Sequence, residues 1–153
     1  MGSTGFRNIV SDKDDHFTGA LAQNAIESES IDMPSDWATA GINKCSISEL
    51  SFQADQTGLD MELIFWSNSD YDESNLDESK IINRVTLAAS DGNTIAGTGT
   101  TYYPNPLAQS IEYYDEDHTS KIHVSLVNRD ATAKNGGATG EVVLRMGCTP
   151  SFS

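Results

Sequence analysis

Histidines, paired carboxylates and glycine-rich turns are the parts of this chain that could do chemistry. His16, His118 and His123 lack metal-ligand spacing, and His123 falls on the polar face of an expected strand, which predicts an ordinary exposed or hydrogen-bonded side chain. No serine lies in a Gly-x-Ser-x-Gly turn. The glycines of 97–99 and 134–137 lack the strand-to-helix context of a phosphate-binding loop. The sequence predicts a protein that is not an enzyme and has no cofactor.

Two acidic clusters, at 70–78 and 115–117, are candidates for binding a cation or for acid catalysis. Calcium takes about six to eight oxygen ligands. The first cluster offers Asp70, Asp72, Ser74 and Asn75 but lacks the glycine and the terminal glutamate of an EF-hand. The second cluster could supply paired carboxylates for glycoside hydrolysis, although adjacent residues rarely converge on one bond. We expect solvated loops and no metal, with calcium as the open alternative.

Tyrosines cluster near two prolines, at 102–106 and again at 113–114. Tyrosine rings offer flat apolar faces with polar tips, which suits stacking on sugar rings. Tyrosine is also enriched at protein interfaces for the same reason. Interface packing is the favoured interpretation, and sugar binding is the alternative.

The charge of the chain limits its partners. The 153 residues fit one domain, and the formal net charge is −14. Such a charge repels nucleic acid and anionic membranes. Residues 1–120 hold 21 acidic and 5 basic side chains, whereas residues 121–153 hold 2 and 4. A basic C-terminal region could therefore meet an acidic partner or a neighbouring subunit, or the carboxylates could simply keep the protein soluble.

The start of the chain and its two cysteines bear on the compartment. Residues 1–5 show neither the charged nor the apolar region of a secretory signal, and the longest apolar run, 63–66, is too short to span a bilayer. We expect a soluble protein made in a cytoplasm. There, Cys45 and Cys148 are expected to be small buried thiols, with a bridge between them as the alternative.

Short strands separated by turns predict an all-β protein. The expected strands are 43–53, 59–67, 81–89, 94–96, 111–114, 122–126 and 142–146. A change of parity in the first indicates a bulge near Ser48 and Glu49. Asp91-Gly92 predicts a tight hairpin that returns 94–96 beside 81–89. With no amphipathic helix between the strands, the pattern predicts an antiparallel sandwich or barrel.

Residues 1–40 differ in composition from residues 41–153, which we expect to form the β-sandwich domain. In residues 1–40, polar residues interrupt almost every apolar residue. This segment should therefore be an extended N-terminal arm that is disordered or lies against its own domain or a neighbour. Isolated large side chains such as Phe6, Phe17 and Trp37 would anchor it.

The C-terminal third resembles the head decoration, or cement, proteins of tailed bacteriophages. The resemblance lies in Tyr114 to Arg129, in Ala133-Lys-Asn-Gly-Gly-Ala-Thr-Gly140 and in Glu141-Val-Val-Leu-Arg145; 60–70 is similar too. It covers about half of the chain and excludes residues 1–40.

The resemblance implies a jelly-roll-like β-sandwich, a homotrimer and a virion structural protein. Such a protein would bind the major capsid protein on the exterior of an icosahedral head and stabilise it, without contacting nucleic acid or membrane. Symmetry would multiply weak contacts into strong binding. The contact residues expected on this basis are Phe6, Phe17, Trp37, Lys121, Arg129, Lys134 and Arg145.

The alternative function is a carbohydrate-binding module or a tail-fibre-type receptor-binding domain. It would use the tyrosines near 102–106, with or without calcium. A glycan array and a calcium-dependent melting shift separate the two functions, because a decoration protein should show neither response.

Overall fold

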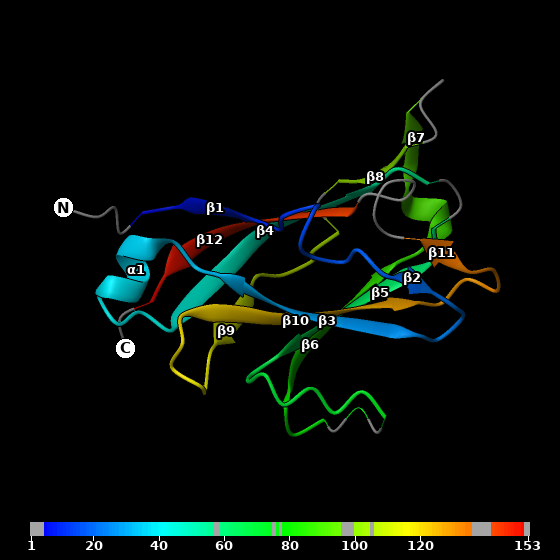
Figure 1. Ribbon diagram of the computed structural model, residues 1–153. Helices are drawn as coiled ribbons and strands as arrows, with labels where there is room; N and C mark the ends of the chain where they lie inside the picture. The colour runs from blue at the N-terminus through cyan, green and yellow to red at the C-terminus, as the bar shows by residue number, and fades with distance from the viewer. Residues whose placement is uncertain are drawn as a thin grey trace.

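The computed structural model shows a sandwich of two antiparallel sheets (Figure 1). It describes residues 5–56, 59–74, 76, 78–95, 100–104, 106–135 and 142–151. The six-stranded sheet has the order β1 (Arg7–Val10), β12 (Val142–Pro150), β4 (Lys44–Ala54), β8 (Thr100–Tyr103) and β7 (Asn93–Ile95), with β9 (Ile111–Tyr114) also on β4. The four-stranded sheet has the order β3 (Ile26–Asp32), β10 (Lys121–Asn128), β5 (Met61–Trp66) and β6 (Ile81–Leu87).

Short elements accompany the two sheets in the described part of the chain. They are a two-stranded ladder of β2 (Ala20–Leu21) and β11 (Lys134–Asn135), the helix α1 (Ser35–Thr39) and a 3₁₀ turn at Ala89–Asp91. Most connections between strands cross from one sheet to the other, as in jelly-roll sandwiches. The predicted all-β sandwich is confirmed.

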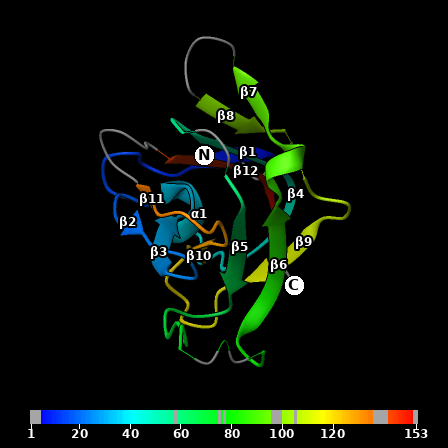
Figure 2. The same ribbon diagram turned by 90° about the vertical axis from the view of Figure 1, so that its right-hand side faces the viewer.

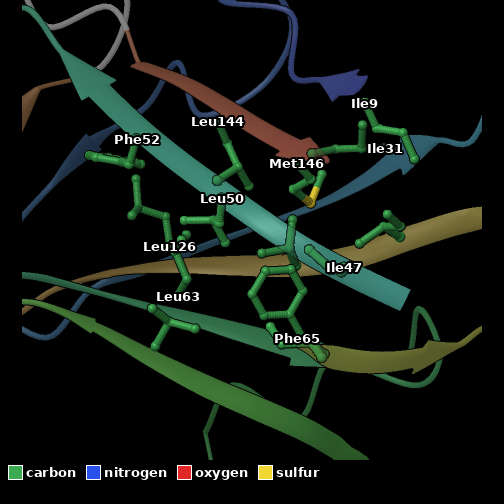
Figure 3. Close-up of a cluster of buried hydrophobic side chains, with 14 of the residues drawn as sticks. Ile9, Ile31, Ile47, Leu50, Phe52, Leu63, Phe65, Leu126, Leu144 and Met146 are labelled. Carbon is green, nitrogen blue, oxygen red and sulfur yellow. The ribbon is translucent and has the colours of Figure 1, made fainter. Parts of the chain in front are cut away.

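The core lies between the two sheets and is built by alternation along each strand. In β12, Leu144 and Met146 point inward, while Arg145 between them is exposed. Facing them from the four-stranded sheet are Leu63 and Leu126 (Figure 3). Burial of these side chains is the main force that holds the sheets together.

The bulge predicted in the first core strand is present in β4. Glu49 pairs with Gly147 and Ile47 pairs with Cys148, so Ser48 is the extra residue. The bulge allows Ile47 and Leu50 both to face the core, although they differ in parity.

Residues 5–40 belong to the sandwich and do not form a separate arm. β1 pairs with β12 in one sheet, and β3 pairs with β10 over its whole length in the other. Lying against its own domain was one of the expected outcomes, but the predicted boundary at residue 40 does not separate two units. Hydrogen bonds to β10 and β12, which come late in the chain, hold this segment in the sheets. Its polar sequence could not predict this pairing.

The hairpin predicted at Asp91-Gly92 is wrong. β7 pairs with β8 in the six-stranded sheet, whereas β6 belongs to the other sheet. Gly92 has an extended backbone (φ −83°, ψ 145°), so it does not make a positive-φ turn. The glycine is needed because a Cβ atom there would lie 2.8 Å from the ring of Tyr103.

The outer faces of the two sheets differ. The segment between β5 and β6 covers the four-stranded sheet, where Tyr71 and Leu76 pack on Ile64, Trp66 and Val127. Many outward residues of the six-stranded sheet are exposed, among them Asn8, Gln53 and Arg145. Among the described residues, no helix is long and apolar enough to cross a bilayer.

Candidate interaction surface and a buried polar network

The outer face of the six-stranded sheet carries the large apolar side chains that are exposed among the described residues. Phe6, Val10, Tyr102 and Tyr114 are between 36% and 48% exposed, and each lies on or beside a strand of this sheet. Phe6 lies over Gly147, where a Cβ atom would be 2.4 Å from its ring. We call this surface the open face. Its exposed aromatic and apolar groups are of the kind that anchor protein interfaces.

Charges on the open face balance, although the chain has a net charge of −14. Its described strand residues carry two basic side chains, Lys44 and Arg145, and two acidic ones, Glu49 and Glu112. A shallow hollow of about 260 Å³ lies between Asn8, Glu49, Ser51, Tyr102 and Arg145. The negative potential of the molecule therefore comes from its other surfaces, and the open face can approach an acidic surface without strong repulsion.

Two of the seven predicted contact residues, Phe6 and Arg145, lie on the open face. Phe6 covers Gly147, which is two residues from Arg145. Among the described residues, Arg145 has no ion-pair partner. An exposed ring and a guanidinium on the same face can bury apolar area and donate charge-assisted hydrogen bonds to one partner.

The other aromatic anchors are core residues. Phe17 and Trp37 are each only 1% exposed and pack in the cluster between the sheets. The prediction that they contact a partner is therefore wrong, because the segment that carries them folds into its own domain. An aromatic residue isolated in a polar sequence gives no sign of whether it lies on a surface or fills the edge of a core.

The remaining predicted basic contacts have acidic partners within the chain. Lys121 binds Asp32 at 2.8 Å, and Lys134 lies 4.0 Å from Asp130. Arg129 donates to Glu62 at 2.8 Å, and Glu62 also binds Arg84 at 2.9 Å. Burial opposes ionisation of Glu62, but the two guanidinium groups outweigh it and keep its pKa below the ordinary value. These cations are committed to intramolecular pairs, so they are weaker candidates than Arg145.

Asp115 is the centre of a buried network that the sequence did not reveal. Its carboxylate accepts hydrogen bonds from the backbone of Asp117, Thr119 and Lys121, from the Thr119 hydroxyl and from His123 Nε2, at 2.8 to 3.1 Å. Burial opposes ionisation, but these bonds outweigh it and hold the pKa of Asp115 below its ordinary value. The predicted solvated loop at 115–117 is wrong at Asp115, which is 2% exposed.

The network continues from His123 to the loop that covers the four-stranded sheet. Because the Asp115 carboxylate can only accept, Nε2 of His123 donates to it, and Nδ1 accepts from the Ser30 hydroxyl at 2.7 Å. The Ser30 oxygen also contacts the hydroxyl of Tyr71. Tyr71 packs edge-on against the His123 ring. Of the two states predicted for His123, exposed or hydrogen-bonded, the structure shows the hydrogen-bonded one. The side chain is only 1% exposed because Tyr71 covers it.

The chemical capacity of this network is small. Ser30, His123 and Asp115 follow the order of a nucleophile, a base and an orienting carboxylate. However, the Ser30 hydroxyl is engaged by both His123 and Tyr71. Asp115, Asp117 and His123 lie close enough to hold a metal, yet five donors already occupy the oxygens of Asp115. The arrangement is suited to fixing the 115–121 turn, where His118 and Ser120 have positive φ angles.

Tyr113 joins the two sheets at the same place. Its hydroxyl donates to the carbonyl of Trp66 at 2.8 Å and accepts the backbone N–H of His123 at 2.8 Å. Burial raises the pKa of Tyr113 above its ordinary value, so the phenol stays protonated. Of the tyrosines considered for binding, Tyr113 and Tyr103 are buried, while Tyr102 and Tyr114 are exposed.

Comparisons with known proteins give no family. No protein-family model matches the chain, and no curated protein sequence matches it. Among solved structures, the Desmodium yellow mottle tymovirus structure is 12% identical, covers 97% of this chain and 87% of its own, and has a TM-score of 0.34. Cocksfoot mottle virus is 11% identical, covering 97% and 86%, with a TM-score of 0.38.

A bacterial structure matches at a similar level. The K3 cleaved adhesin domain of Lys-gingipain from Porphyromonas gingivalis is 11% identical, covers 94% of this chain and 74% of its own, and has a TM-score of 0.36. With TM-scores below 0.5, none of these similarities supports a conclusion about function or partners.

Proposed function

We propose that this protein is a virion structural protein of the head-decoration type, which binds the exterior of an icosahedral capsid through its open face and stabilises the shell. The observation that carries the proposal is the presence of Phe6, Val10, Tyr102 and Arg145 on one sheet face whose described strand residues carry no net charge. The resemblance of the C-terminal third to phage decoration proteins supports the same function.

The proposed attachment combines apolar burial with one strong polar contact. Phe6, Val10 and Tyr102 supply apolar and aromatic area, and Arg145 lies within the same surface. Interface energy is usually concentrated in a few aromatic and arginine side chains near the centre of the contact. A homotrimer would repeat this surface three times, and linked weak contacts give strong binding.

The test is binding to heads that lack this chain, measured by co-sedimentation. Arg145→Gln and Phe6→Ala should each weaken binding by about tenfold, the loss typical of an interface anchor. Lys121→Gln is the matched control, since it also removes one positive charge but from the four-stranded sheet. Equal binding by all three variants and the wild type would remove the open face from the proposal. A wild-type chain that does not sediment with heads would remove the function.

A carbohydrate-binding role is the second candidate, and the hollow on the open face favours it. The exposed ring of Tyr102 lies there beside Asn8, Glu49 and Arg145, a mixture of a flat ring and polar side chains that suits a sugar. A glycan array separates the two functions. Specific glycan binding that Tyr102→Ala abolishes would favour this candidate, and a blank array would favour the capsid.

A further inference from the structure

Strand β6 forms one edge of the four-stranded sheet and lies along the side of the molecule (Figure 2). Within the described part of the chain, no strand pairs with its outer side. At alternate residues an edge strand directs its backbone N–H and C=O groups away from its own sheet. These N–H and C=O groups can form hydrogen bonds with the backbone of another extended chain.

A hollow of about 420 Å³ lies directly beside this edge. Asn83, Arg84, Val85 and Thr86 line one side of it, and residues 106–109 line the other. The edge is therefore bordered by an open space, and the segment that precedes β9 forms its far wall. An extended peptide placed there would add a strand to β6 and contact a second wall with its side chains.

The other described edges are protected or short. β3 carries Glu27, Glu29 and Asp32 along its length, and charged residues on an edge discourage strand pairing. β1 and β9 have four residues each, and β7 has three. β6 has seven residues without a carboxylate or a proline, and its residues 83–87 pair regularly with β5, beyond a bulge at Ile82. Its one cation, Arg84, is held by Glu62 at 2.9 Å. Of these strands, β6 is the one best suited to receive a partner strand.

The charge of the molecule indicates the kind of segment that would bind. The chain has a net charge of −14, and the exposed carboxylate of Glu78 lies 4.0 Å from Arg84 beside the edge. The one charged side chain that lines the hollow, Arg84, is balanced by Glu62, so the net negative charge of the molecule favours the approach of a basic segment over an acidic one. We propose that β6 is a strand-addition site for an extended, positively charged segment of a capsid subunit. This inference rests on the proposed function and names a second contact made in the same complex.

Amide hydrogen exchange gives the direct test. The full chain is bound to heads in D₂O, released, and analysed amide by amide by NMR. Strand addition should slow exchange by about tenfold or more at alternate residues of β6, those whose N–H groups point away from β5. The intervening amides already bond to β5 and should change little. Protection on the open face alone would overturn the inference while leaving the function intact, whereas failure to bind heads would overturn both.

A matched pair of substitutions at Thr86, an exposed position of β6, provides a second test. Thr86→Lys should weaken head binding severalfold, because it repels a basic segment and blocks the edge as natural lysines do. Thr86→Glu introduces the opposite charge on a side chain of similar length. Any charge on the edge hinders pairing, but the carboxylate also attracts a basic segment, so Thr86→Glu should bind more tightly than Thr86→Lys. Equal effects of the two variants would contradict the proposed charge of the segment.

Discussion

Replacing Asp115 with alanine should destabilise this protein more than any surface change on the same turn. The carboxylate accepts five hydrogen bonds and is 2% exposed, so its removal leaves several buried donors without an acceptor. An unpaired buried donor costs about 1–3 kcal/mol, and bonds to a charged group contribute roughly 1.5–3 kcal/mol each. These costs overlap when the donors share one acceptor. We expect Asp115→Ala to lower the free energy of unfolding by roughly 3–5 kcal/mol.

The assay is urea or thermal unfolding, with Asp117→Ala as the control. Asp117 lies in the same turn and accepts two hydrogen bonds, both from Ser69, at 2.8 and 2.9 Å. Its side chain is 35% exposed, so its loss should cost only about 1 kcal/mol. In a domain of this size the Asp115 variant should melt roughly 6–20 °C below the wild type.

Acid supplies a second check on the same variant. The pKa of Asp115 in the folded protein lies below its ordinary value of 3.8, so the contribution of its ionised form is present above that value. That contribution is lost as the pH falls through the folded pKa. The stability gap between the wild type and Asp115→Ala should therefore narrow below pH 3.8. Equal destabilisation by the two alanine variants, or a gap independent of acid, would refute the role given to Asp115.

Three further predictions concern other parts of the fold. Gly147→Ala places a Cβ atom 2.4 Å from the Phe6 ring, so the ring must move. Binding to heads should therefore fall as in Phe6→Ala. Calorimetry should show a change in the free energy of unfolding of about 1 kcal/mol or less. Cys45 and Cys148 are diagonal across β4 and β12, a placement that separates Cα atoms by about 7–8 Å, too far for a bridge without backbone movement. Titration of the unfolded protein without reductant should find two thiols, and finding none would show a bridge. Burial and a hydrogen bond with its neighbouring carboxyl raise the pKa of Glu29 from 4.5 to about 7, so its stabilising contribution is complete below pH 4.5 and is lost as the pH rises through about 7. Glu29→Gln should remove that loss from the pH profile of the melting temperature; an unchanged profile would contradict the raised pKa.

The central strands could be predicted because their side chains alternate. In β4 the change of parity between Ile47 and Leu50 was enough to predict the bulge at Ser48. In β12 the alternation placed Leu144 inward and Arg145 outward, as observed. Such patterns reflect burial on one face of a strand, which the sequence records directly.

The N-terminal strands could not be predicted in the same way. β3 reads Ile-Glu-Ser-Glu-Ser-Ile-Asp, with polar residues on both faces. Its inward carboxylates, Glu27 and Glu29, accept the backbone N–H groups of Gly19 and Phe17 at 2.7 and 3.4 Å. A contact between segments brought together only by folding leaves no local pattern. The polar character of β3 therefore predicted an arm where a strand exists.

The polar face of β10 shows the same limit. His123 and Ser125 alternate with apolar residues and so suggested an open surface. The loop that carries Tyr71 covers them, and the Ser125 hydroxyl accepts the indole N–H of Trp66 at 2.8 Å. A sequence shows that a face is polar, but it does not show whether a distant loop covers that face. The open face was found only when the sheet order brought Phe6 and Arg145 together.

The orientation of this protein on a virus head tests the central claim most directly. Cryo-electron microscopy of heads to which the chain has been added back should show a sandwich on the capsid exterior, with β1, β12 and β4 facing the shell and Phe6 and Arg145 inside the contact. Density in which the six-stranded sheet faces solvent would contradict the assignment of the open face. Heads that remain bare at saturating protein would contradict the proposed function.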